Sequence, residues 1–368
     1  MDIEKLIDEA RKAQNEGRYK EAIEIYTSHL NNIDDELGKA KVLYHLSKLY
    51  LRVGEVYKAQ NTITEAIALA KNKEDADILA KVYEGAIDVY SSVGNHDAVQ
   101  RYFKLGLRYA EDAELETQFN FYNVVAIYLF DRGKIGVAGE YWKKCLNIAK
   151  NMGDNHLISI AYNNLGEVYR IRNELEKALR NYKESYEYSK KEYEYRTMAI
   201  ALLNMGYIER ERGELEQSEK YLRESVELYE KHKDDGTASA CLGTYALVLA
   251  DLKKYEDALN AAKKAVALAH KIGDRSAIGE ATLYLGYVYE AKGDYKEAMR
   301  VYNDAHRVLE DIKNLVLLSE CEMSMGRVLC KGNMKEAARF HLERAIKISG
   351  EIGEFCVTQK AKMLMSKC

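Results

Sequence analysis

Five asparagines recur at one phase of a repeating pattern in the middle of the chain: Asn120, Asn123, Asn163, Asn164 and Asn204. Asn164 and Asn204 each stand two residues before a glycine. An amide carries donors and an acceptor together, so it can pair with the backbone of an extended peptide whatever the peptide's side chains are. The pattern therefore predicts a peptide-binding channel that the asparagines face.

Charged and aromatic residues occupy the same phase beside the asparagines: Glu167, Arg170, Tyr207, Arg210, Tyr284 and Tyr287. Arg170 and Arg210 can each clamp a carboxylate through two parallel hydrogen bonds, and tyrosines offer apolar area with a polar tip. The same phase in other repeats gives Lys41, Tyr44, His45, Lys48, Leu51, Lys81, Glu84, Asp88, Thr244, Glu280, Glu290, Glu320 and Arg327. The alternative is that these residues are solvated positions on long helices, with no ligand.

Motifs for catalysis, nucleotides or metals are absent from the sequence. No H-E-x-x-H, G-x-G-x-x-G, G-x-S-x-G or phosphate-loop motif occurs. None of the eight histidines pairs with another His or Cys at a spacing of three or four residues. Cys145 and Cys241 occupy small apolar positions, which favours structural burial over reactive thiols. We therefore expect no enzyme, no catalytic residue, no metal site and no cofactor.

The elements that must position these side chains repeat about every 40 residues. Turn residues recur at Gly17, Gly54, Gly94, Gly133, Asn173, Gly213, Lys253, Gly293 and Gly332. Five residues after most of them stands a small residue, as at Ala178, Ser218 and Ala337. Between turns, apolar residues recur at spacings of three and four, which is the period of a helix and not of a strand. Each repeat is thus predicted to be a pair of helices.

Glycine and aspartate set the ends of these helices. Gly153-Asp154 and Gly273-Asp274 have the order expected of a C-terminal cap followed by an N-terminal cap. Gly206 and Gly286 instead lie inside predicted helices, where glycine costs about 1 kcal/mol relative to alanine. Their recurrence at one phase predicts that a neighbouring helix approaches closely there.

The repeated motif resembles the tetratricopeptide repeat. The motif consists of a Leu or Met, then Gly, two further residues and a Tyr. It occurs at Leu165-Gly166 to Tyr169 and at Leu285-Gly286 to Tyr289, and a looser copy begins at Met205-Gly206. The resemblance covers about residues 3 to 350. The period of 40 rather than 34 is similar to the subgroup of kinesin light chains, spindle adaptors and bacterial peptide-responsive regulators. The chain departs from the family in having no proline, where about 5% usage would give roughly 18.

The resemblance implies an all-α, right-handed superhelical solenoid of about nine antiparallel helix pairs over residues 1–352. The first helix of each pair would line the concave side. Residues 353–368 would form a C-terminal capping helix of the same continuous domain, with Phe355, Val357, Met363 and Met365 covering the last repeat. In the resembled subgroup the asparagine two residues before the glycine contacts the ligand backbone, which here implicates Asn164 and Asn204. Positions His45, Thr244 and Tyr284 depart from that pattern.

Composition limits the partners. Lys and Arg (55) nearly balance Asp and Glu (59), which disfavours nucleic acid as a partner. The longest apolar run, from Val124 to Phe130, is far too short to span a membrane. The N-terminus lacks the features of a signal peptide, and the six cysteines form no regular framework. We therefore expect a cytoplasmic protein with reduced thiols and a protein or peptide ligand.

These observations favour a non-enzymatic scaffold that holds a segment of a partner along the concave face. The main alternative is a peptide-sensing regulator of the bacterial signalling type. Such regulators usually carry an N-terminal DNA-binding domain or helical bundle, whereas this sequence begins its first repeat at about Ile3. Self-association through exposed repeat faces is a third alternative.

Overall fold

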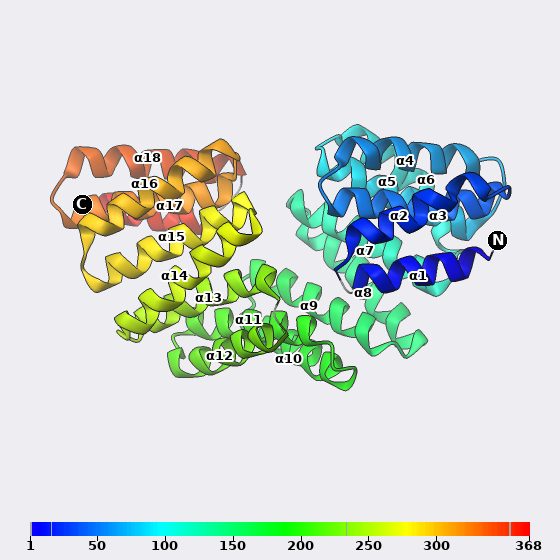
Figure 1. The fold of residues 1–368 in the computed structure, drawn as a ribbon. Helices are drawn as coiled ribbons and strands as arrows, with labels where there is room; N and C mark the ends of the chain where they lie inside the picture. Colours follow the sequence, from blue (N-terminus) through cyan, green and yellow to red (C-terminus); the bar gives the residue numbers. More distant parts are fainter. Residues whose placement is uncertain (1, 16, 233, 353–354) are drawn as a thin grey trace. The chain divides into compact units, whose positions relative to one another are not determined.

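The computed structural model describes residues 2–15, 17–232, 234–352 and 355–368, which are helical almost throughout (Figure 1). These residues contain no β-strand, so the predicted all-α fold is confirmed. Contacts divide the chain into two compact units, Met1–Ile171 (unit 1) and Arg172–Cys368 (unit 2). The predicted single solenoid over residues 1–352 with a cap at 353–368 stays a prediction.

The helices of each unit follow one another with short connections. The described part of unit 1 consists of α1 (Ile3–Asn15), α2 (Tyr19–His29), a 3-10 helix (Leu30–Asn32), α3 (Glu36–Arg52), α4 (Val56–Ala70), α5 (Ala76–Ser92), α6 (His96–Ala110), α7 (Leu115–Asp131), α8 (Ile135–Met152) and α9 (Asn155–Ile171). The described part of unit 2 consists of α10 (Leu175–Lys191), α11 (Tyr195–Arg212), α12 (Leu215–His232), α13 (Asp235–Asp251), α14 (Tyr255–Ile272), α15 (Arg275–Lys292), α16 (Tyr295–Asp311), α17 (Leu315–Lys331), α18 (Lys335–Ile352) and α19 (Phe355–Lys367).

Helical hairpins are the building blocks of both units. The pairs α1–α2, α3–α4, α5–α6 and α7–α8 form unit 1, and α9 packs on α8. The pairs α11–α12, α13–α14, α15–α16 and α17–α18 form most of unit 2, where α10 packs on α11 and α19 packs on α18. The remaining one of the nine predicted pairs, α9 with α10, is the fifth along the chain. It would span the division between the units and stays a prediction.

Odd-numbered helices form one layer within each unit, which we call the odd-helix layer. In unit 1, α3 contacts α1 and α5, and α5 also contacts α7. In unit 2, α13 contacts α11 and α15, while α17 contacts α15 and α19. The even-numbered helices pack outside these contacts and form an even-helix layer. The first helices of neighbouring repeats are therefore in contact within each unit. A binding surface made of side chains from several repeats requires this arrangement.

Residues with positive φ end most of the first helices. Gly213 has φ 83° and is the left-handed C-terminal cap of α11. Lys253 (φ 61°) and Asn173 (φ 58°) hold the same conformation without being glycine. In the last repeat the predicted turn residue Gly332 was wrong: its φ is −80°, and Asn333 takes φ 58°.

The small residue of the last repeat shifts with that turn. Five residues after Asn333 stands Ala338, which is completely buried, whereas the predicted Ala337 is exposed. The one-residue error in the turn therefore carried over to the packing position.

The glycines inside the helices have the predicted packing role. A Cβ atom on Gly206 would lie 2.5 Å from Cγ of Leu222, on the second helix of the same pair. A Cβ atom on Gly286 would lie 2.5 Å from Cδ1 of Tyr302 in the same way. Only glycine permits this approach without displacing a buried side chain.

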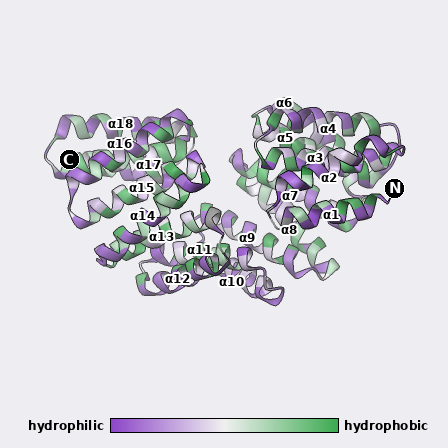
Figure 2. Ribbon diagram, viewed as in Figure 1, coloured by the Kyte–Doolittle hydropathy of each residue, from purple (hydrophilic) through white to green (hydrophobic). Residues whose placement is uncertain are grey.

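Hydrophobic and hydrophilic residues alternate along the helices in both units (Figure 2). The largest fully buried side chains include Tyr26, Tyr182, Tyr229 and Tyr302, so tyrosine builds much of the core. None of the described helices combines the length and the continuous apolar character that a membrane span requires.

The helix α19 covers part of the last repeat. Val357 and Ala361 are buried, and Met365 packs against the same cluster. Met363 was predicted to join this set but is 57% exposed. Phe355 begins the helix, and its side chain lies outside the described part of the chain.

The expectation of reduced cysteines was wrong for two of them. Cys330 at the end of α17 and Cys368 form a disulfide. Cys145, Cys241 and Cys321 are free and buried, which agrees with the predicted structural role of the first two. Burial raises the pKa of the Cys145 and Cys241 thiols to about 12, so neither is a reactive thiolate at neutral pH.

Candidate peptide-binding site

All eleven predicted ligand-binding residues lie on odd-numbered helices and are half-buried. Unit 1 holds Asn120 and Asn123 on α7, and Asn163, Asn164, Glu167 and Arg170 on α9. Unit 2 holds Asn204, Tyr207 and Arg210 on α11, and Tyr284 and Tyr287 on α15. The predicted phase thus selected the odd-helix layer in both units. We call the first set the amide patch and the second set the tyrosine patch.

Two asparagines of the amide patch are hydrogen-bonded to each other. The Nδ2 atom of Asn164 donates to Oδ1 of Asn123 at 3.1 Å, which links α9 to α7. The same oxygen accepts a hydrogen bond from Nε1 of Trp142 at 2.9 Å. The indole can only donate, so Trp142 fixes the orientation of the Asn123 amide. The pair therefore presents one amide of set orientation from each of two neighbouring odd helices.

Arg170 does not offer an empty carboxylate clamp. Its Nε and Nη2 atoms both donate to Oε2 of Glu167, at 3.0 and 2.8 Å. The two side chains are three residues apart on α9 and are 29% and 23% exposed. The predicted role of Arg170 in binding a ligand carboxylate would require it to exchange this internal partner.

Arg210 also has an internal carboxylate partner, Asp251 on α13. Nε of Arg210 donates to Oδ2 of Asp251 at 2.6 Å, and the Tyr287 hydroxyl donates to Oδ1 at 2.6 Å. A further hydrogen bond of 3.3 Å joins Nη2 of Arg210 to the Tyr287 oxygen. Burial alone would lower the pKa of Arg210, but Asp251 raises it above its ordinary value. Three consecutive odd helices are thus joined through one carboxylate.

A second carboxylate extends this network to α17. Glu290 accepts two hydrogen bonds from Arg327, Nε to Oε1 at 2.7 Å and Nη2 to Oε2 at 2.8 Å. The Tyr302 hydroxyl donates to Oε2 of Glu290 at 2.9 Å. The Tyr287 ring lies under two guanidinium groups, 5.4 Å from Arg210 and 5.9 Å from Arg327.

Tyr284 has a partner on its own helix. Its hydroxyl donates to Oε1 of Glu280 at 2.9 Å, one turn earlier on α15. Its ring packs on α13 at Gly243, where a Cβ atom would lie 2.8 Å from Cδ2 of the ring. Burial raises the pKa of both Tyr284 and Glu280. Tyr284 therefore packs between α13 and α15, and its predicted role in ligand binding stays a prediction.

A polar cluster in unit 1 was left out of the predicted site although it has the same phase. Nζ of Lys48 on α3 donates to Oε1 of Glu84 on α5 at 2.8 Å, and Glu84 is almost fully buried. The adjacent His45 lies among cationic side chains. Burial, followed by the positive charge of Arg11 and three lysines, lowers the pKa of His45 to about 3. His45 is therefore neutral at physiological pH.

Opposite charges one repeat apart are the sequence signal for these internal partners. The separations are 36 residues for Lys48 and Glu84, 41 for Arg210 and Asp251, and 37 for Arg327 and Glu290. Asp251 was missed because it lies one repeat away from Arg210, and Trp142 because it lies on the second helix of its pair, whereas only the first helices were searched. Within the described ranges, no group of three or more His, Cys, Asp or Glu residues is placed to hold a metal ion.

Comparison with family models supports the repeat assignment. A tetratricopeptide-repeat model matches residues 117–191 and 197–271, and a second such model matches residues 280–307. A model of anaphase-promoting complex subunit 5 matches residues 12–88. No curated relative matches the chain in sequence.

Solved structures of similar fold cover nearly the whole chain. The apo form of the quorum sensor NprR from B. thuringiensis is 16% identical and covers 94% of this chain and 98% of its own, with a TM-score of 0.66. Aspartyl phosphate phosphatase F from Bacillus subtilis is 12% identical and covers 94% of both chains, with a TM-score of 0.65. A Rap protein complexed with competence and sporulation factor is 12% identical, and the match covers 89% of this chain and 97% of the Rap chain, with a TM-score of 0.61.

At these identities the structural similarity establishes the fold alone. The period of about 40 residues, the stacked helical hairpins and the matched family models all agree. Residues 117–191, 197–271 and 280–307 of this chain are tetratricopeptide repeats.

Proposed function

We propose that this protein is a non-enzymatic scaffold that binds an extended peptide segment of a partner on its odd-helix layer. The observation that carries the proposal is the hydrogen-bonded pair of Asn123 and Asn164, held by Trp142. Asn164 donates one of its hydrogens internally and keeps its carbonyl oxygen for a ligand amide. A side chain that is already oriented loses less conformational freedom on binding, so such a pair suits recognition of a peptide backbone.

The tyrosine patch supports the proposal in a modified form. Because Asp251 and Tyr287 hold Arg210, a ligand carboxylate would have to displace Asp251 to be clamped there. We therefore assign Arg210 the role of positioning α11 against α13, and Asn204, Tyr207, Tyr284 and Tyr287 remain proposed ligand contacts in unit 2. Asn120, Asn163, Glu167 and Arg170 remain proposed members of the amide patch.

A peptide selection followed by titration tests the proposal. A displayed peptide library is selected on the purified chain, and the enriched peptide is titrated by calorimetry. We expect Asn164→Ala to weaken binding by about tenfold, the equivalent of one lost hydrogen bond of about 1.4 kcal/mol. Asn303→Ala on α16 is the matched control, because Asn303 is exposed on the even-helix layer and bonds only to its own helix at Met299. Equal weakening by both variants, or by neither, would contradict the proposal.

A peptide-responsive regulator is the second candidate. One structural neighbour is named a quorum sensor, and another is a Rap protein complexed with competence and sporulation factor. The charged network from Arg210 to Arg327 could transmit binding along unit 2, because it joins four odd helices. X-ray scattering with the selected peptide separates the candidates: compaction favours the regulator, and an unchanged radius favours the scaffold.

The remaining expectations belong to the same proposal. We place the protein in the cytoplasm, although a disulfide such as Cys330–Cys368 is rare in that compartment. We assign it no enzymatic activity, although one neighbour of this fold is named a phosphatase. Neither nucleic acid nor a membrane is a proposed partner. Self-association is tested by light scattering over a wide range of protein concentration.

A further inference from the structure

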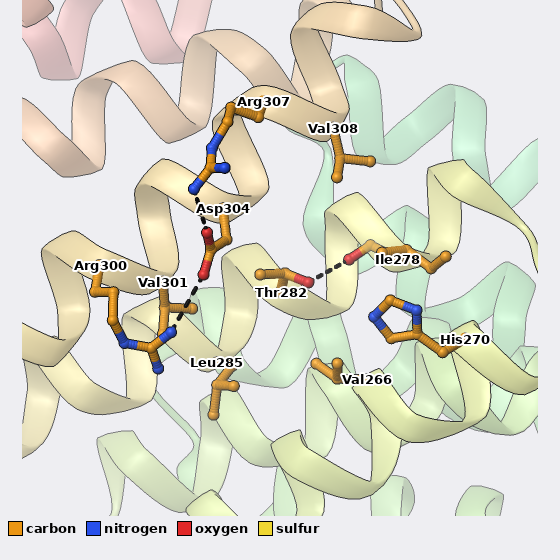
Figure 3. A pocket seen from close by; sticks show the side chains of 10 residues that line it. All are labelled: Val266, His270, Ile278, Thr282, Leu285, Arg300, Val301, Asp304, Arg307 and Val308. Carbon is orange, nitrogen blue, oxygen red and sulfur yellow. Dashed lines mark hydrogen bonds and ion pairs between the residues drawn. The ribbon is translucent and has the colours of Figure 1, made fainter.

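Unit 2 has a pocket of about 440 Å³ on its even-helix side (Figure 3). Its walls are the neighbouring even helices α14 and α16, and its floor is α15. Val266, Ile278, Leu285 and Val308 give it an aliphatic lining. Thr282 lies at the centre of the floor.

Thr282 has a shorter side chain than the residues at the equivalent position of other repeats. At intervals of 40 residues the same position is occupied by Tyr122, Tyr162, Leu202, Leu242 and Glu322. The Thr282 hydroxyl donates to the carbonyl oxygen of Ile278 at 2.6 Å, so the side chain folds back on its own helix. The pocket exists because a large side chain is missing from this repeat.

The corresponding space is filled by the chain itself in other repeats. Tyr122 on α7 is buried, with its ring 5.8 Å from that of Tyr141 on α8. In the last repeat, Glu322 accepts hydrogen bonds from His306 on α16 at 2.9 Å and from His341 on α18 at 2.6 Å. A tyrosine or a carboxylate is therefore the kind of group that fits between two even helices in this fold.

Charged side chains line the rim of the pocket. Asp304 is the only acidic residue in its lining, and two arginines share it: Nη1 of Arg300 at 3.2 Å and Nη2 of Arg307 at 2.6 Å. Arg300 is also paired with Glu297, at 2.9 Å, so Arg307 is the arginine that favours an acidic ligand. His270 lies on the opposite wall (Figure 3). Arg307 contacts Asp304 through Nη2 and its side chain is 77% exposed, so, unlike the half-buried Arg170 and Arg210, it can offer its remaining N–H groups to a ligand at the rim. A partner carboxylate at the rim would gain a charge-assisted hydrogen bond there.

We propose that this pocket is a second binding site, which takes the tyrosine side chain of an acidic segment of a partner protein. The ring occupies the space that Tyr122 fills in its own repeat, and a carboxylate beside it pairs with Arg307. The site lies on the even-helix side and is independent of the proposed odd-helix peptide site. A partner could thus be held on both layers of unit 2.

Three short peptides and methyl-labelled protein test this inference. The probes are acetyl-Asp-Tyr-Asp-amide, acetyl-Lys-Tyr-Lys-amide and acetyl-Asp-Gly-Asp-amide, each added up to millimolar concentration. We expect only the first to shift the methyl resonances of Thr282, Ile278, Leu285 and Val308. No shift with the first probe, or equal shifts with all three, would overturn the proposal.

Two substitutions localise the effect. Thr282→Tyr fills the pocket with the residue found at position 122 and should weaken binding of the Asp-Tyr-Asp probe at least tenfold. Thr282→Ser leaves the pocket open and should bind as the native protein does. Circular dichroism and a cooperative thermal transition check that the Tyr variant folds. Should it fail to fold, Arg307→Glu decides: it should bind the Lys-Tyr-Lys probe better than the Asp-Tyr-Asp probe, and an unchanged preference overturns the proposal.

Discussion

The guanidinium of Arg210 on α11 is held by the carboxylate of Asp251 on α13, with Nε and Oδ2 2.6 Å apart. The Tyr287 hydroxyl on α15 binds the other oxygen of the same carboxylate. Two residues that the sequence places in a ligand site are therefore joined by a third residue of the chain. A tetratricopeptide repeat makes such contacts available because its first helices are neighbours, so residues one repeat apart come together.

Removal of Arg210 should destabilise unit 2. Arg210→Ala leaves the half-buried Asp251 carboxylate with Tyr287 as its remaining partner, which we expect to cost about 1–3 kcal/mol. Arg339→Ala is the control, because the pair of Arg339 and Glu343 is largely exposed, and its loss should cost less than about 0.5 kcal/mol. Urea denaturation measures both. Equal losses of unfolding free energy in the two variants would show that the Arg210 network stabilises the protein no more than an exposed ion pair does.

The glycine inside α11 should not accept a side chain. A Cβ atom at position 206 would lie 2.5 Å from Cγ of Leu222, so Gly206→Ala should destabilise the protein by about 1–3 kcal/mol through overpacking. Gly350→Ala in α18 is the matched control, since no heavy atom lies within 4 Å of its Cβ position. That substitution should instead stabilise the protein by about 0.5–1 kcal/mol. The same denaturation measurement applies, and a stabilised Gly206→Ala variant would refute the packing role.

Acid should remove the contribution of Glu322. Burial alone would raise its pKa, but hydrogen bonds from His306 and His341, with the charge of Arg344, lower the pKa from 4.5 to about 2. Because the folded pKa is the lower one, the stabilisation is present above about pH 5 and is lost as the pH falls toward 2. The full effect is on the order of 3 kcal/mol.

The substitution Glu322→Gln isolates that contribution. The free energy of unfolding of the native protein should fall more steeply between pH 5 and pH 2 than that of the variant. Glu343→Gln, at an exposed carboxylate, should keep the native slope. Parallel curves for the native protein and Glu322→Gln would contradict the assignment.

The disulfide should hold α19 on the last repeat. Cys330 and Cys368 are 38 residues apart, and the loop that they close contains α18 and α19. On the chain-entropy model such a loop contributes about 4 kcal/mol. Reduction of the native protein should therefore speed hydrogen exchange in α19. In Cys368→Ser the exchange should already be fast and insensitive to the reductant, and unchanged exchange on reduction of the native protein would contradict this role.

The fold could be predicted from the sequence because the same local signals return every 40 residues. As expected, Gly206 allows close packing inside its helix, and Gly153-Asp154 and Gly273-Asp274 cap the helix ends. Asp274, for example, accepts hydrogen bonds from the N–H groups of Ser276 and Ala277. Where a turn is irregular, as at Gly332 and Asn333, the local signal was ambiguous and the prediction shifted by one residue.

The site was predictable only in part. Helical periodicity identified the layer on which Asn164 and Arg210 lie, since it depends on one helix at a time. It did not identify Asp251 as the partner of Arg210, because that contact depends on how two repeats stack. The pocket at Thr282 left a trace in the sequence, a small residue where other repeats have Tyr or Leu, but its meaning depends on the helices around it.

Trp142 offers the most direct test of peptide binding on the odd-helix layer. It is the only tryptophan of the chain, and its indole hydrogen-bonds to Asn123 of the amide patch. Titration of the native protein with the selected peptide should shift the Trp142 emission along the same saturation curve that calorimetry gives. Asn164→Ala should move the curve to about tenfold higher peptide concentration, and Asn303→Ala should leave it in place. A peptide that binds by calorimetry without changing the Trp142 emission, and equally well to Asn164→Ala, would contradict the account.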